Sequence, residues 1–141
     1  MPTVSYGVLL IDEEHEILLA HSTGNRHWDI PKGQGEPDEL PLVAALRELK
    51  EETGIELSPE ALVDLGPQAY RADKVLHLFL ARVVKRDIDP RSCICTSFFT
   101  HPLSGKALPE MDDFQWAPFS KVPELCAKNM ARVLTKLLPT L

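Results

Sequence analysis

Cysteine is scarce in this chain, and its distribution argues against a disulfide framework. The 141 residues contain 3 cysteines, at positions 93, 95 and 126, and no C-x-x-C pair. An odd set of thiols without that spacing is typical of a reducing compartment. Cys93 and Cys95, with His101 nearby, could be zinc ligands, but small core side chains are the better interpretation of the pair.

Long hydrophobic runs are absent as well. No apolar stretch approaches the roughly 18 to 20 residues that cross a membrane. The first ten residues carry neither a basic region nor a small-residue cleavage pattern. We therefore expect a cytoplasmic protein with no signal peptide and no membrane partner. The length and a hydrophobic content of 44% predict a single globular domain over residues 1–141.

Basic residues are outnumbered, with 15 Lys and Arg against 21 Asp and Glu, for a net charge of -6. This balance argues against a long nucleic acid as partner, because such binding needs a basic face. The excess is concentrated in residues 36–60, which hold eight acids and two bases, whereas the charges of the remaining chain cancel. The acidic segment is therefore the first place to look for function.

Hydrophobic periodicity predicts strands interleaved with two helices. Apolar segments at 3–11 and 17–21, joined by the polar residues DEEHE, predict a hairpin. Further strands are expected at 28–30, 61–65, 74–84, 92–99 and 114–117, and a helical tail is expected after a cap at Ser120. The pattern predicts an α/β or α+β sandwich with a mixed sheet between helices.

A helix is predicted within the acidic segment, over residues 39–53. Asp38 is a plausible N-cap, Pro41 fits the first helical turn, and Gly54 can end the helix in a left-handed conformation. These three residues therefore define the expected limits of the helix.

Three glutamates share one face of that helix. Glu48, Glu51 and Glu52 have the spacing at which like charges destabilise a helix, by roughly 0.2 to 0.5 kcal/mol per pair. Mg2+ or Mn2+ would offset the repulsion, because hard divalent cations prefer carboxylate oxygen and often bridge to phosphates. A solvated acidic face is the alternative, and the spacing alone leaves both open.

The residues that begin at position 33, GQGEPDELPLVAALRELKEETGI, resemble the Nudix box, G-x5-E-x7-R-E-U-x-E-E-x-G-U, in which U is aliphatic. All nine specified positions are present: Gly33, Glu39, Arg47, Glu48, Leu49, Glu51, Glu52, Gly54 and Ile55. The resemblance implies a Nudix α/β/α sandwich, with a mixed sheet between a central box helix and a C-terminal helix. It also implies a metal-dependent pyrophosphohydrolase that cleaves a nucleoside diphosphate linked to another moiety.

The resemblance further implies which residues hold the metal. Glu48 and Glu52 would be the core ligands of Mg2+ or Mn2+, with Glu51 and the carbonyl of Gly33 as further ligands. Such a metal would neutralise charge that develops on the phosphates and would lower the pKa of a bound water.

Glu48, Glu51 and Arg47 form the expected catalytic set. Glu48 is the favoured residue to orient or deprotonate the attacking water, and Glu51 and Glu110 are its rivals. Arg47 can pair with Glu51 or reach back to Glu39, so we expect Arg47 and Glu39 to position the other groups.

Segments outside the box resemble the diadenosine polyphosphate hydrolase branch of the family. These are W-D-I-P-K-G before the box and K-V-L-H-L-F-L-A after it, although Val75 follows Lys74 directly. The resemblance implies a small-molecule nucleoside polyphosphate as substrate, such as diadenosine tetraphosphate. Lys32 and Lys74 would contact the polyphosphate, Trp28 or a downstream aromatic would flank the base, and Glu110 could add a metal ligand. A solvated Lys74 and a core-packed Trp28 are the alternatives.

Other substrates and another class of function stay open. L-P-E-M-D-D-F-Q-W resembles the segment with which oxidised-purine triphosphate hydrolases read the base, which would make Asp112 and Asp113 base readers. ADP-ribose or sugar-nucleotide pyrophosphatases and enzymes of RNA 5′ ends are further alternatives. A non-catalytic nucleotide-binding module is the alternative of another class, but such modules usually lose box glutamates. The irregular segment 86–109 matches neither branch, and a homodimer, although open, has no recognisable interface.

Overall fold

A mixed sheet of seven strands forms the centre of the structure, a computed structural model that describes residues 2–141. The strand order is β3-β2-β1-β6-β5, with β4 paired to β1 and β9 paired to β2. β1 and β6 are parallel, and the other pairs of this sheet are antiparallel. The strands are β1 (Thr3–Ile11), β2 (Glu16–Ser22), β3 (Trp28–Asp29), β4 (Lys32–Gln34), β5 (Leu62–Arg71), β6 (Lys74–Arg82) and β9 (Met111–Pro118).

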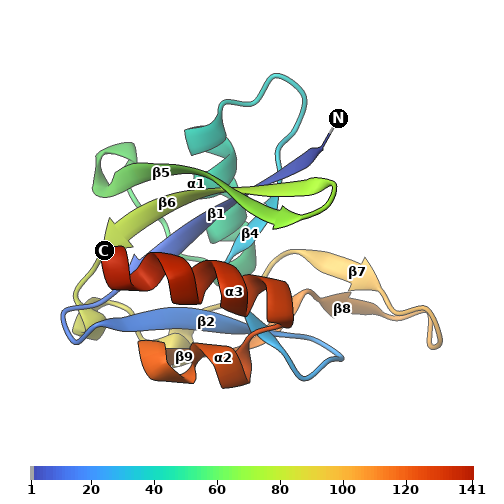
Figure 1. The fold of residues 1–141 in the computed structure, drawn as a ribbon. Coiled ribbons are helices and arrows are strands. Elements are labelled where there is room, and N and C mark those ends of the chain that lie inside the picture. The colour runs from blue at the N-terminus through green and yellow to red at the C-terminus, as the bar shows by residue number, and fades with distance from the viewer. Residues whose placement is uncertain (1) are drawn as a thin grey trace.

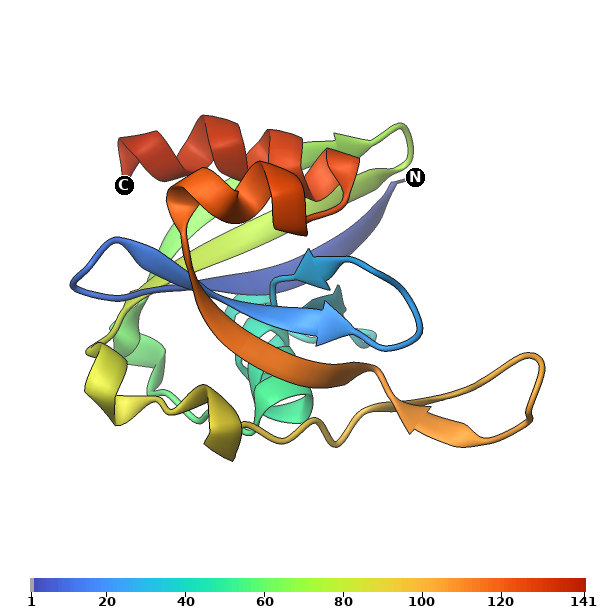
Figure 2. The same cartoon turned by 90° about the horizontal axis from the view of Figure 1, so that it is seen from below.

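Helices cover both faces of the sheet (Figures 1 and 2). The helices are α1 (Pro41–Thr53), α2 (Val122–Leu125) and α3 (Lys128–Leu137). Because alternate residues of a strand point to opposite faces, Val8 and Leu10 pack in the cluster that includes α1, while Leu9 and Ile11 pack in the cluster that includes α3. All four side chains are at most 2% exposed. The α/β/α sandwich predicted from the sequence is confirmed.

The box helix α1 begins later than the sequence predicts. Its first residue is Pro41, its N-cap is Leu40, and no side chain caps its first turn. Asp38 as N-cap is therefore wrong: this residue has a φ of 64° and lies in the loop before the helix. Proline tolerates the uncapped start because it has no N–H to satisfy. The other end is as predicted, since Gly54 adopts a φ of 80° and donates its N–H to the Lys50 carbonyl.

The strand predicted over 92–99 is wrong for most of its length. The irregular chain up to residue 97 leads into a separate two-stranded arm, β7 (Phe98–Thr100) and β8 (Ala107–Pro109). This arm projects from the body of the molecule in Figures 1 and 2. The prediction failed because an alternating pattern of side chains does not show which groups the backbone N–H and C=O of the segment will bond to.

Residues 94 and 96 bond to the box helix instead of joining a sheet. The N–H of Ile94 donates to the carbonyl of Thr53 at 3.0 Å, and the N–H of Thr96 donates to the carbonyl of Glu51 at 2.6 Å. The last carbonyls of a helix have no partner within the helix. This segment therefore satisfies the carboxyl end of α1.

The remaining strands are confirmed in position and differ in length. β5 begins at Leu62 after a 3-10 turn and continues to Arg71 beside β6, beyond the predicted 61–65. β6 ends at Arg82, whereas the prediction extended it to residue 84. Pairing between neighbouring strands sets these limits more strongly than local composition.

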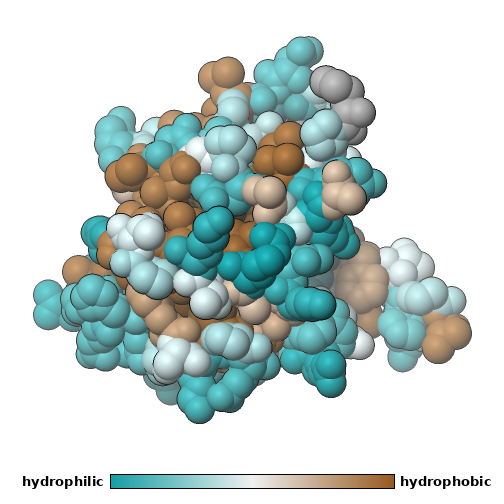
Figure 3. All heavy atoms as spheres, viewed as in Figure 1, coloured by the Kyte–Doolittle hydropathy of each residue, from teal (hydrophilic) through white to brown (hydrophobic). Residues whose placement is uncertain are grey.

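The predicted helical tail is interrupted. Ser120 lies in a 3-10 turn and caps neither helix, and the chain between α2 and α3 is extended at Cys126. There Cys126 forms a parallel bridge with Trp28, which a continuous helix would prevent. Figure 3 shows hydrophilic side chains over the outer face of α3, as expected for an amphipathic helix. No helix within residues 2–141 is long and apolar enough to cross a membrane.

Candidate active site

Gly33 on β4 leaves room for the carboxylate of Glu48 on α1. The two residues are so close that a Cβ at position 33 would overlap the carboxyl carbon and both carboxyl oxygens of Glu48. Only glycine permits this approach of strand and helix. The Glu48 side chain is 10% exposed, and burial raises its pKa above the ordinary value although Arg47 opposes the rise. The Glu48 carboxyl is therefore held in a desolvated position.

Glu52 lies one helical turn after Glu48 and is 2% exposed. Its Oε1 accepts a hydrogen bond of 3.0 Å from the backbone N–H of Lys32 on β4. Burial raises the pKa of Glu52 to about 9 against the opposing effect of that N–H, and the neighbouring carboxyl of Glu110 raises it further. Glu48 and Glu52 thus present two buried carboxyls to the same strand.

The guanidinium of Arg47 connects the glutamates with the loop before the helix. It donates to both oxygens of Glu39, at 2.8 and 3.0 Å, to Glu48 Oε1 at 3.0 Å and to Glu51 Oε2 at 3.2 Å. A further bond of 3.0 Å reaches the carbonyl of Gln34. The bonds from Arg47 lower the pKa of Glu39 to about 2. Both pairings considered from the sequence, with Glu39 and with Glu51, therefore exist together.

The three helix glutamates differ in environment. Glu51 is at the rim, with a side chain 40% exposed, whereas Glu48 and Glu52 are buried. Within residues 2–141, Glu52 forms no ion pair. Buried carboxyls without enough cationic partners are costly, and a hard divalent cation that prefers oxygen ligands would relieve that cost. The carboxyls of Glu48 and Glu52 are candidate ligands for such an ion.

A cleft of about 410 Å³ opens beside Glu52. The residues that line it are Ser22, Thr23, Asp29, Lys32, Glu52, Phe99, Glu110 and Met111. Within it the ammonium of Lys32 pairs with Asp29 at 3.0 Å. Burial lowers the pKa of Lys32, but the Asp29 carboxylate outweighs this effect and the pKa is raised overall. The cleft therefore brings together Glu52, Glu110 and a charged Lys32, three residues predicted from the sequence.

Four predicted substrate-binding residues lie outside this lining, and three of them have partners elsewhere. Trp28 packs against the core on the α3 side, with its ring centroid 5.1 Å from that of His21. Asp112 is 2.5 Å from Nδ1 of the same His21, and Asp113 bonds to the backbone N–H of the next residue. These contacts engage the side chains that the sequence patterns assign to recognition of the nucleobase.

Lys74, at the start of β6, also lies outside the lining but near Lys32 and Arg71. Burial lowers the pKa of Lys74, and the charges of Lys32 and Arg71 lower it further. Like charges have this effect only when they are near one another. Lys32, Arg71 and Lys74 thus form a group of three cations, which suits a polyphosphate.

Five residues of the cleft have no place in the sequence-based assignment: Ser22, Thr23, Asp29, Phe99 and Met111. Asp29 could have been found, because it lies within the W-D-I-P-K-G motif three residues before Lys32. Thr23 follows β2 and Phe99 lies on β7, and no spacing in the sequence relates either residue to the box. Only the tertiary fold brings them to Glu52.

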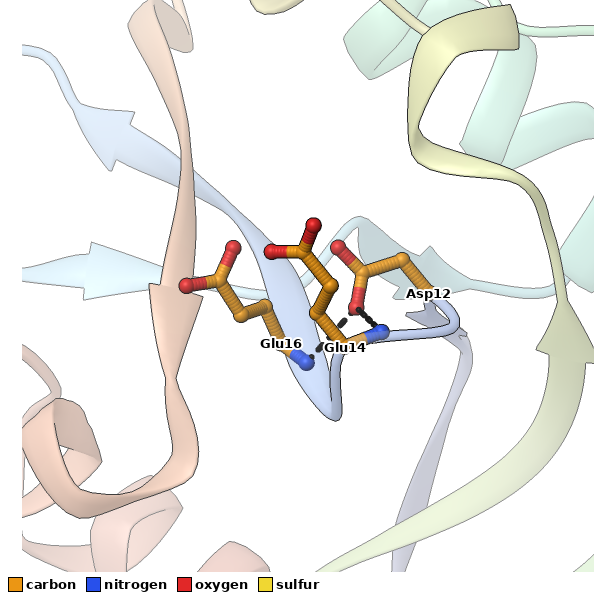
Figure 4. Close-up of side chains that lie close together, drawn as sticks. All are labelled: Asp12, Glu14 and Glu16. Atoms are coloured by element: carbon orange, nitrogen blue, oxygen red, sulfur yellow. Dashed lines mark hydrogen bonds between the residues drawn. The ribbon is translucent and has the colours of Figure 1, made fainter.

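A second acidic cluster lies in the β1–β2 turn and is separate from the box. Figure 4 shows the carboxylates of Asp12, Glu14 and Glu16 gathered there. The ammonium of Lys85 approaches all three, at 3.7 Å from Asp12 and 3.0 Å from Glu14. Within residues 2–141 this is the one place where three His, Cys, Asp or Glu side chains each bring a ligand atom within 4.8 Å of the others, and neither the box glutamates nor Cys93 belongs to it. The lysine already supplies this cluster with a counterion.

A larger cavity, of about 610 Å³, lies at the carboxyl end of α1. Residues between 53 and 57 and between 82 and 93 line it, and none of the box glutamates does so. Size alone would place a ligand there, but three carboxyls, one of them the buried Glu52, and a lysine identify the smaller cleft as the candidate active site.

Comparison with known proteins agrees with this geometry. A model of the NUDIX domain matches residues 1–138. An uncharacterised 17.7 kDa protein of Enterobacteria phage T4 is 34% identical over 146 residues, which cover 97% of this chain and 96% of that protein. An RNA pyrophosphohydrolase of Pseudomonas putida is 27% identical over 155 residues, which cover 96% of this chain and 91% of the relative.

A third relative covers only part of the chain. An asymmetrical bis(5′-nucleosyl)-tetraphosphatase of Rattus norvegicus is 39% identical over 80 residues, which are 53% of this chain and 54% of the relative. The match with that enzyme thus spans about half of its length.

Solved structures share the fold. An Ap4A hydrolase of C. elegans in a binary complex has a TM-score of 0.66 and 22% identity, with 96% of each chain covered. The Nudix domain of Shewanella oneidensis NrtR with ADP ribose has a TM-score of 0.71 and 15% identity, covering 99% of this chain and 88% of that one. At these identities the likeness establishes the architecture alone.

Proposed function

Because this chain belongs to the Nudix hydrolase family, whose members act on pyrophosphate bonds, we propose that it hydrolyses a dinucleoside polyphosphate, such as diadenosine tetraphosphate, with Mg2+ or Mn2+. One observation carries the proposal: the complete box folds so that the buried carboxyls of Glu48 and Glu52 lie beside Gly33 and the backbone of Lys32. The adjoining cleft has a volume within the range of small-molecule sites.

The residues of the box fit a divalent cation. Glu48 and Glu52 would hold it, with Glu51 and the Gly33 carbonyl as further ligands. The fit is supported by the burial of Glu52 without an ion pair among residues 2–141 and by the space that Gly33 leaves for a carboxylate. When bound, such an ion supplies charge neutralisation at the phosphates and a water of lowered pKa.

Glu48 is our proposed general base. Arg47 binds its Oε1, and Oε2 is left to accept the proton of the attacking water. Glu51 is a weaker candidate, because it is at the rim and one of its oxygens is bound to Arg47. Glu110 is also weaker, because it faces Glu52. Arg47 and Glu39 act as positioning residues, since their bonds hold the glutamates in place.

Lys32 and Lys74 are our proposed phosphate contacts. Lys32 lies in the cleft, and its pair with Asp29 keeps the ammonium charged and restricts its rotation. Lys74 is close enough for its pKa to respond to Lys32. Two neighbouring cations suit a chain of several phosphates better than a single phosphate.

The choice of substrate rests on the rat tetraphosphatase, which is 39% identical over half of the chain. The RNA pyrophosphohydrolase of Pseudomonas putida supports a rival, triphosphorylated RNA, and its match covers nearly the whole chain at 27% identity. The net charge of -6 disfavours this rival, because an RNA chain needs a basic track. The contacts of Asp112 with His21 likewise disfavour a base reader of oxidised purines.

A substrate panel tests the proposal. The purified chain would be assayed with Mg2+ or Mn2+ on diadenosine tetraphosphate, 8-oxo-dGTP, ADP-ribose and 5′-triphosphorylated RNA. We expect the highest kcat/KM for diadenosine tetraphosphate and a loss of at least a hundredfold for Glu52→Gln. Activity confined to another member of the panel would show that diadenosine tetraphosphate is not the substrate. No turnover of any member would refute the proposal that the chain is an enzyme.

A further inference from the structure

The lining of the candidate cleft combines two kinds of side chain. Asp29, Lys32, Glu52 and Glu110 are ionic, whereas Phe99 and Met111 supply apolar surface. A ligand that matches both kinds carries a charged part and a flat apolar part. We propose that Phe99 and Thr23 form the nucleoside subsite of this cleft, a step that rests on the proposed function because the phosphates of the same ligand would lie at the box.

Phe99 has the position that a stacking residue needs. It lies on β7, where successive side chains point to opposite faces, so Phe99 lines the cleft while Phe98 is 58% exposed. The ring of Phe99 is half-buried. A planar base binds such a ring by stacking, which tolerates any base because every base has a π-face.

The root of the arm fixes Phe99 relative to the carboxyls. The carbonyl of Ser97 accepts the N–H of Glu110 at 2.8 Å, and the carbonyl of Glu110 accepts the N–H of Thr23 at 3.0 Å. Cys95, two residues before Ser97, is buried with Ala20 and Met111. The arm therefore leaves the body from a rigid base, and Phe99 stands only two residues beyond it.

Thr23 supplies a separate observation. Its Oγ1 is buried and has no hydrogen-bond partner within residues 2–141. A buried hydroxyl without a partner costs stability, so its presence in a cleft suits a polar group that arrives with the ligand. We assign Thr23 Oγ1 to the polar edge of the nucleoside whose face lies on Phe99.

Binding of ADP and of inorganic pyrophosphate separates this subsite from the phosphate site. Both would be measured by calorimetry with Mn2+ for the intact chain and its variants. We expect Phe99→Ala to weaken ADP binding about 5- to 150-fold and to leave pyrophosphate binding unchanged. Phe98→Ala, on the opposite face of the same strand, is the matched control and should change neither. Phe99→Tyr keeps the ring and should restore ADP binding.

Thr23→Val provides a second readout that a structural role would not give. Valine has the same shape without the hydroxyl, so the melting temperature should stay constant or rise, while ADP binding weakens about two- to tenfold. Equal losses for ADP and pyrophosphate in Phe99→Ala, or an equal effect of Phe98→Ala, would overturn the assignment. ADP binding that follows these expectations without hydrolysis of any nucleotide would reject the proposed function and retain the subsite.

Discussion

The buried carboxyl of Glu52 should make the stability of the protein depend on pH. Its pKa is about 9 in the folded protein, raised first by burial, whereas an exposed glutamate ionises near 4.5. The folded state therefore prefers the protonated form. As pH rises above about 4.5 the unfolded state releases this proton first, and the free energy of unfolding of the metal-free protein falls until the pH reaches about 9.

Replacing Glu52 with glutamine should stabilise the metal-free protein at neutral pH. Glutamine keeps the shape and cannot ionise, so Glu52→Gln should raise the melting temperature by a few degrees at pH 8 and have little effect at pH 4. Thermal unfolding in EDTA measures both values. Glu60→Gln, an exposed acid outside the helix, is the control for the change in charge. A lower melting temperature for Glu52→Gln at pH 8 would refute this account.

Gly33 should be intolerant of even one methyl group. A Cβ would overlap the Glu48 carboxyl, so Gly33→Ala must displace Glu48 or separate β4 from α1. We expect kcat to fall at least tenfold, since a misplaced catalytic group is costly, and unfolding free energy to fall by about 1 to 3 kcal/mol. Steady-state kinetics and chemical denaturation measure the two effects. Unchanged kcat would mean that the position of Glu48 is not critical.

At the level of elements, the sequence predicts best where local chemistry determines the structure. The carboxyl end of α1 follows from Gly54, and the box glutamates follow from helical spacing. The amino end does not, because Leu40 and Asp38 give no local sign that the helix begins without a side-chain cap. Long-range pairing explains the other errors, as at Thr96, whose N–H finds a helix carbonyl rather than a strand.

The same distinction applies to the candidate site. The ionic residues could be predicted because a motif fixes their spacing, and Asp29 lies inside such a motif. Thr23 and Phe99 could not, because their approach to Glu52 depends on where β2 ends and where the arm leaves the body. Tertiary contacts between distant segments carry that information.

Lys85 should anchor the 3-10 turn that follows β6 to the β1–β2 turn. Its ammonium is the counterion of Glu14, Glu16 and the buried Asp12. Lys85→Met leaves three carboxylates close together without their counterion, so the melting temperature should fall by several degrees at pH 7. Lys136→Met, an exposed lysine on α3, is the control. Equal melting temperatures for both variants at pH 7 would contradict the anchor.

At the scale of the whole molecule, the number of domains and the oligomeric state stay predictions. Both hydrophobic clusters share the strands of one sheet, which supports a single domain over residues 1–141. A homodimer also stays a prediction, and light scattering of the purified chain would determine its mass in solution.

The acidic excess of the chain receives a partial explanation from the fold. Within residues 36–60, the carboxylates of Glu39, Glu48 and Glu51 pair with Arg47, and Glu56 pairs with Lys50. One guanidinium cannot neutralise three carboxylates, and Glu52 has no ion pair in the part of the chain that the structure describes. Without a metal, the box should repel a polyanion.

Nucleotide affinity should therefore depend on a divalent cation. We expect ADP to bind at least tenfold more tightly with Mn2+ than in EDTA, because the cation reverses the local repulsion and bridges to phosphate. Calorimetry at constant ionic strength measures the difference. Glu52→Gln should lose most of this dependence, whereas Glu60→Gln, the same substitution in the same segment but outside the helix, should retain it. Equal ADP affinity with Mn2+ and in EDTA would show that the acidic segment serves another purpose.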